Sequence, residues 1–69
     1  MNAKRFEAAL RQEYLHVARE WKKANAEKNM GLMAMFGGAK QSLRRLAEAT
    51  GYTNFIWTLD EQVLKEASP

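Results

Sequence analysis

Residues 52–59, YTNFIWTL, determine whether this chain contains a β-strand or folds entirely as helices. Aromatic and β-branched side chains dominate the segment, and propensity alone would make it a strand. However, nothing else in the chain offers a partner strand, and a lone strand would leave its backbone groups unpaired. We therefore predict a helix over residues 54–66. Its apolar face would be formed by Tyr52, Ile56, Leu59, Val63 and Ala67.

The start of this helix has two alternatives. Thr53 can act as the N-cap, whereas Thr58 followed by Glu61 forms a capping box that would start the helix later. In either case Trp57 and Leu64 stack on a flank of the apolar face. Gly51 is well placed as the C-terminal cap of the preceding helix, because glycine adopts the left-handed conformation without a steric penalty.

Residues 3–28 contain no glycine or proline and predict one long amphipathic helix, with Asn2 as its N-cap. At roughly 100° per residue, one stripe is apolar. It contains Ala3, Phe6, Leu10, Tyr14, Val17, Trp21 and Ala24. Leu15 points away from this stripe and so does His16, the only histidine, which is expected to be a surface residue.

Charges flank the long stripe on both sides. Glu13, Glu20 and Glu27 recur every seven residues along one edge, and Lys4, Arg11 and Lys22 follow the other. Such segregation is typical of helices that pair with a second helix, so we expect self-association. The alternative is a solvated helix surface on which acidic and basic side chains one turn apart form local ion pairs.

Residues 29–40, NMGLMAMFGGAK, connect the two halves. Asn29 and Gly31 both tolerate the left-handed conformation and mark a helix end and reversal. A second stripe then follows, in which Met35 and Phe36 are expected to face the core. It contains Leu32, Met35, Phe36, Ala39, Leu43, Leu46, Ala47 and Thr50. Because paired glycines usually break helices, we expect a kink or break at Gly37-Gly38, although a continuous helix keeps the same phase.

The expected fold is an all-α single domain over residues 1–69, with a long N-terminal helix packed on a helical second half of two or three further helices. The chain has 69 residues, no cysteine and a net charge of +3. No apolar run approaches the 18 or so residues of a membrane span, and early charges argue against a secretory signal, so we expect a cytoplasmic protein without a membrane partner.

The sequence offers little for chemistry. The only serines are Ser42 and Ser68, and the glycines do not follow a strand as a phosphate-binding loop would require. The carboxylates lie on exposed helix flanks, where pKa values are rarely tuned for catalysis. We therefore expect no enzyme, no cofactor and no metal site.

Binding is the remaining class of function. We first expect that the chain binds a partner protein and acts as a small adaptor or inhibitor. Methionine and aromatic side chains that lie off the main stripes are typical of interaction hot spots. The candidates for partner binding are Met30, Met33, Phe55, Trp57 and Leu15.

Nucleic-acid binding is the second expectation. Residues 46–55, LAEATGYTNF, resemble the turn region of helix-turn-helix proteins, with Leu46, Ala47 and Gly51 at matching positions. The resemblance implies that Thr53, Asn54 and Phe55 start a recognition helix. The chain departs from that pattern because the family's next buried apolar positions would fall at Trp57 and Asp60, whereas the apolar face here runs one residue earlier, through Ile56 and Leu59. The basic candidates are Lys40, Arg44 and Arg45, which we expect on the outer side of the second-half helix.

Overall fold

The computed structural model describes residues 2–66 and contains three helices, α1 (Ala3–Ala26), α2 (Met30–Thr50) and α3 (Thr53–Lys65). Within these residues no strand occurs, which confirms the all-α fold with the N-terminal helix as the longest element. The predicted helix over 54–66 is α3, shifted by one residue. Ala67, the last residue of its predicted apolar face, lies outside the described residues.

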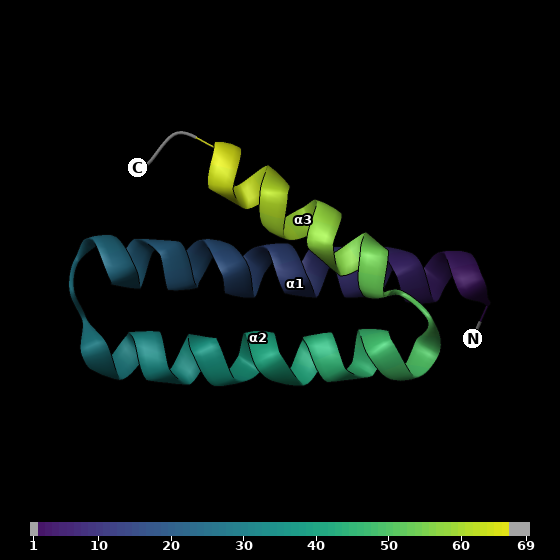
Figure 1. Cartoon of the computed structure of the whole chain (residues 1–69), viewed down its shortest axis with the longest axis horizontal. Helices are drawn as coiled ribbons and strands as arrows, with labels where there is room; N and C mark the ends of the chain where they lie inside the picture. The colour runs from purple at the N-terminus through teal and green to yellow at the C-terminus, as the bar shows by residue number, and fades with distance from the viewer. Residues whose placement is uncertain (1, 67–69) are drawn as a thin grey trace.

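The first two helices form an antiparallel hairpin, and α3 crosses it on one side (Figure 1). The chain enters α3 beside the start of α1, and α3 then runs diagonally over α1, so that its second half moves away from α2. Phe6 of α1 fixes the entry, since its ring centroid lies 5.3 Å from that of Tyr52. This arrangement leaves a cleft between α2 and α3. The face of the α1–α2 hairpin that lies opposite α3 stays uncovered.

The ends of α1 and α2 follow local capping chemistry with one exception. Asn2 accepts a hydrogen bond from the Arg5 amide, as predicted for the α1 N-cap, and Gly51 ends α2 with φ of 82°. The exception is the first turn, where Lys28, not Asn29 or Gly31, adopts positive φ (55°). Asn29 instead caps α2 by accepting from the Leu32 amide, so its side chain starts a helix and does not end one. At α3, Tyr52 is the N-cap residue, without a side-chain bond, so neither threonine caps this helix.

The expected break at Gly37-Gly38 is wrong, because α2 continues without interruption from Met30 to Thr50. Each glycine costs a helix about 1 kcal/mol relative to alanine. Packing along the full length of α1 outweighs that local cost. Trp21 of α1 lies against Gly37, so that a Cβ built there would be 3.5 Å from the indole Nε1, an ordinary contact distance.

Alanine substitution at two glycines is expected to have opposite effects. Gly38→Ala should raise the free energy of unfolding by about 1 kcal/mol, because the position is helical and nothing lies within 4 Å of the added Cβ. Gly51→Ala should lower it by about 1 kcal/mol, because φ of +82° strains any L-residue. Urea unfolding measures both, and a destabilised Gly38→Ala would contradict a continuous, unstrained α2.

The core lies where the three helices meet. Its buried cluster consists of Leu10, Tyr14, Ala18, Ala47, Ile56, Leu59 and Val63. Leu15 and Phe55 are half-buried against this cluster, so the expectation that Leu15 points outward is wrong. Met35, expected in the core, is 57% exposed, whereas its neighbour Phe36 is half-buried. Both errors have one cause: α3 covers the side of α1 that carries Leu15 and leaves the other hairpin face, with Met35, uncovered.

None of the helices described is long and apolar enough to cross a membrane.

Candidate interaction site between α2 and α3

A single carboxylate, Asp60 of α3, joins all three helices below the cleft. Asp60 is 9% exposed, and its Oδ1 accepts a hydrogen bond of 2.6 Å from the Tyr14 hydroxyl of α1. Its Oδ2 accepts a bond of 2.6 Å from the Arg44 guanidinium of α2, and Lys40 Nζ lies 3.7 Å from Oδ1. Arg44 Nε also donates to the Tyr14 hydroxyl at 3.1 Å. Among the described residues, no buried side-chain nitrogen or oxygen lacks a hydrogen-bond partner, as a buried polar network requires.

Lys40 and Arg44 each also lie over an indole ring. Lys40 Nζ is 4.8 Å from the ring centroid of Trp21, and the Arg44 guanidinium carbon is 5.5 Å from that of Trp57. Such stacking is favourable for a cation that has lost part of its hydration. Both positive charges are thus held between Asp60 and an aromatic face. Their expected placement on the outer side of α2 is wrong.

The same network changes the ionisation of Tyr14. Burial raises the pKa of Tyr14 well above its ordinary value of 10.0, and the Asp60 carboxylate raises it further, while Arg44 opposes the shift. In Lys40, burial lowers the pKa, and the Asp60 carboxylate partly opposes that change. The side chain of Tyr14 therefore stays a neutral hydrogen-bond donor in the folded protein at pH values where a free tyrosine ionises.

Alkaline unfolding is expected to report this shift. Above pH 10 the unfolded chain loses the Tyr14 proton while the folded chain keeps it, so stability should fall as pH rises. The slope is about 1.4 kcal/mol per pH unit for one proton. The free energy of unfolding of the wild type and of Tyr14→Phe is measured in urea between about pH 9 and 11, a range around the ordinary pKa of tyrosine. The difference between the two pH profiles isolates the contribution of Tyr14, because all other groups titrate in both proteins. Parallel pH profiles for the two proteins would contradict the proposed shift.

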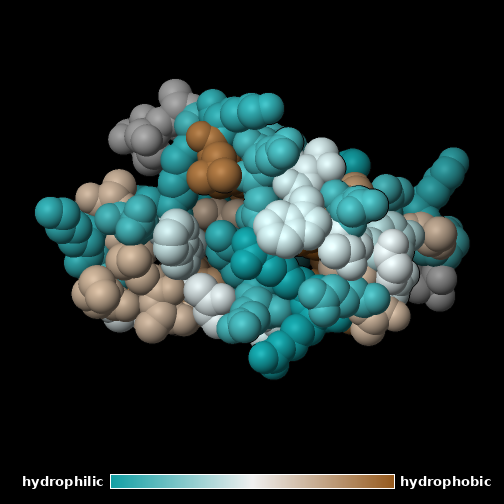
Figure 2. Space-filling model, viewed as in Figure 1, coloured by the Kyte–Doolittle hydropathy of each residue, from teal (hydrophilic) through white to brown (hydrophobic). Residues whose placement is uncertain are grey.

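The cleft above Asp60 has two exposed apolar side chains on α3. Trp57 is 58% exposed and Leu64 is 76% exposed, and their seven-residue spacing places them on one side of the helix. The cleft has a volume of ≈ 350 Å³. It is lined by Lys40, Arg44, Trp57, Asp60, Glu61 and Leu64. Figure 2 shows hydrophilic atoms between α2 and α3 and an apolar side chain on the second half of α3.

The structure brings together candidates that the sequence assigned to two different functions. Trp57, a partner-binding candidate, and Lys40 and Arg44, nucleic-acid candidates, all line the α2–α3 cleft. Phe55 does not, because it is half-buried between Tyr52 and Arg11, with its ring 5.8 Å from Tyr52. Leu15 does not line the cleft either, because it is half-buried against the core cluster.

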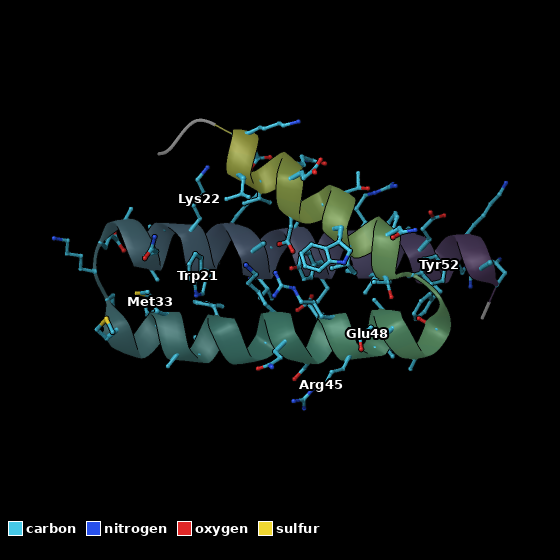
Figure 3. All side chains as sticks on the ribbon, in the orientation of Figure 1. Trp21, Lys22, Met33, Arg45, Glu48 and Tyr52 are labelled. Carbon is cyan, nitrogen blue, oxygen red and sulfur yellow. The ribbon has the colours of Figure 1, made fainter. Side chains whose placement is uncertain are left out.

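The other candidates lie away from the cleft. Met30 is 72% exposed at the start of α2, whereas Met33 is half-buried between α1 and α2 near Trp21 (Figure 3). Arg45 points away from the other helices, and Thr53 and Asn54 are exposed in the first turn of α3. The candidates for each function are therefore divided among separate surfaces.

Sequence reasoning missed Asp60 as the centre of the site. A signal for it exists, because Asp60 lies four residues after Ile56 and three before Val63, inside the apolar face of α3. A charged residue in such a face is expected to have a buried partner. The partners themselves come from α1 and α2 and depend on how the helices cross.

The described residues contain no group of three or more His, Cys, Asp or Glu side chains that could hold a metal ion. His16 is exposed on α1. A comparison of the chain with protein-family models, with curated proteins and with solved structures found no match.

Proposed function

We propose that this protein is a non-enzymatic interaction module that binds a partner protein through the α2–α3 cleft. The observation that carries the proposal is the exposure of Trp57 and Leu64 beside a cleft whose two cations, Lys40 and Arg44, are already paired with Asp60. Tryptophan is enriched among the residues that dominate binding energy. Because Asp60 neutralises much of the local positive charge, apolar contact is expected to contribute more than charge.

Nucleic-acid binding has weaker support. Lys40 and Arg44 are engaged with Asp60, which leaves Arg45 as the exposed cation among the three basic candidates on α2. One such residue neutralises too few phosphates for the affinity that duplex binding requires. Arg45, Thr53 and Asn54 remain the residues on which that alternative would depend.

A photo-cross-linking amino acid at Leu64 tests the proposal in the native cell, with the same amino acid at His16 as the control. The protein captured from position 64 is then purified and its affinity measured directly. Trp57→Ala is expected to weaken that affinity at least tenfold, because a tryptophan at the centre of an interface commonly contributes about 2 kcal/mol or more to the binding free energy. His16→Ala, an exposed change on α1, should leave it unchanged.

Salt dependence separates the two functions. Affinity for the partner should change little between about 50 and 200 mM salt, whereas binding to six or more phosphates would weaken by orders of magnitude. Tight binding of duplex DNA with that steep salt loss, abolished by Arg45→Ala, would refute the proposed function. Arg45 is the appropriate variant because Arg44→Ala would also disturb Asp60.

A further inference from the structure

The hairpin face that α3 leaves uncovered contains a second groove, which we call the rear groove. It has a volume of ≈ 260 Å³ and is lined by Phe6, Ala9, Leu10, Glu13, Leu43 and Leu46. Glu13 follows Arg11 by two residues, and Leu46 follows Arg44 by two, a rotation of about 200° in a helix. Since Arg11 and Arg44 both contact α3 side chains, the rear groove faces away from α3.

One wall of the rear groove is apolar and belongs to α2. Leu32, Met35 and Leu46 are 37%, 57% and 44% exposed, although each is a large apolar side chain. Their spacing follows the helical repeat, so they extend the groove along α2 in one stripe. A stripe of this kind is what the apolar face of another helix packs against.

On the α1 side, the apolar Phe6, Ala9 and Leu10 line the groove together with Glu13, which belongs to an acidic row along α1. Glu13, Glu20 and Glu27 are spaced by seven residues, so they form a row along this edge of α1. None of the three takes part in an ion pair within residues 2–66. The row spans 14 residues, or about 21 Å of helix.

A second copy of this chain is a poor match for the acidic row. Two of the three residues of the basic flank of α1 are used internally, because Arg11 lies over Phe55 and Lys22 donates to the carbonyls of Val63 and Glu66. Of the cations on α2, Lys40 and Arg44 are held by Asp60. A copy that placed α2 over the row would offer Arg45 alone, and a copy that placed α1 there would set glutamate against glutamate.

We propose that the rear groove binds an amphipathic helix of another protein, with an apolar stripe facing α2 and Lys or Arg at seven-residue spacing facing α1. This inference goes beyond the proposed function, because it uses the opposite face and does not involve Trp57. Two binding faces on one small domain would suit a protein that bridges two partners.

Two synthetic helical peptides of about four turns provide the test, since that length matches the acidic row. Both have leucine along one stripe; the first has lysine and its twin has glutamate on the flank. The lysine peptide is expected to bind the wild-type protein at least tenfold more tightly than the glutamate peptide, as measured by fluorescence anisotropy. The double variant Glu13→Lys with Glu20→Lys should reverse that preference; Glu13 is exposed on α1 and Glu20 is half-buried.

A scrambled lysine peptide of the same composition controls for nonspecific attraction and should bind at least tenfold more weakly. Leu46→Asp should weaken the lysine peptide at least tenfold, whereas Trp57→Ala should have no effect, which separates this test from that of the proposed function. Equal affinity for the peptides, or amide shifts mapping to the α2–α3 cleft, would overturn the inference. Sedimentation showing a dimer that Leu46→Asp dissociates would assign the groove to a second copy and overturn it as well.

Discussion

Asp60→Ala is expected to lower the free energy of unfolding by about 3 kcal/mol, because it removes the shared acceptor of a buried network. Without Asp60, the Tyr14 hydroxyl loses its acceptor, and Lys40 and Arg44 are left close together without a counter-charge. The loss is a large share of the total for a chain of this length, for which about 3–10 kcal/mol is usual. Urea unfolding followed by circular dichroism measures it.

Asp60→Asn is the matched control for this prediction. Asparagine keeps the size and one acceptor oxygen but removes the charge, so the expected loss is smaller, about 1–2 kcal/mol. Tyr14→Phe removes two hydrogen bonds, the one donated to Asp60 and the one accepted from Arg44, but leaves Asp60 paired with Arg44, and it should cost about 1–2 kcal/mol. If Asp60→Ala were as stable as the wild type, Asp60 could not be the acceptor that joins the three helices.

Leu59→Ala is expected to lower the free energy of unfolding by about 3 kcal/mol, since Leu59 is 3% exposed and lies in the buried cluster. The cost combines lost burial with the cavity that remains. Leu64→Ala on the same helix is the control, because Leu64 is 76% exposed and its removal should change stability by less than about 0.5 kcal/mol.

Thermal and urea unfolding of the two leucine variants test the docking of α3 directly. Equal losses for Leu59→Ala and Leu64→Ala would mean that α3 does not present Ile56, Leu59 and Val63 to the hairpin. Normal stability of Leu64→Ala also matters for the proposed function, because it allows position 64 to carry a cross-linker without unfolding the protein.

The helices themselves could be predicted from the sequence because their signals are local. Uninterrupted helix formers and Asn2 predicted α1, and Gly51 marked the end of α2. The apolar face with Ile56, Leu59 and Val63 outweighed the strand propensity of residues 52–59. Self-association, the absence of enzymatic activity and the cytoplasmic location remain predictions.

The site depended on contacts between residues far apart in the chain. Tyr14 and Asp60 are 46 residues apart, and no local pattern relates them. The crossing of α3 over α1 leaves Leu15 half-buried, turns Lys40 and Arg44 toward Asp60 and leaves Met35 exposed. Continuity of α2 through Gly37-Gly38 also required the hairpin, because packing against α1 offsets a local cost of about 1 kcal/mol per glycine. Short-range propensity thus sets where helices form, and the free energy of packing between them sets which faces remain available for binding.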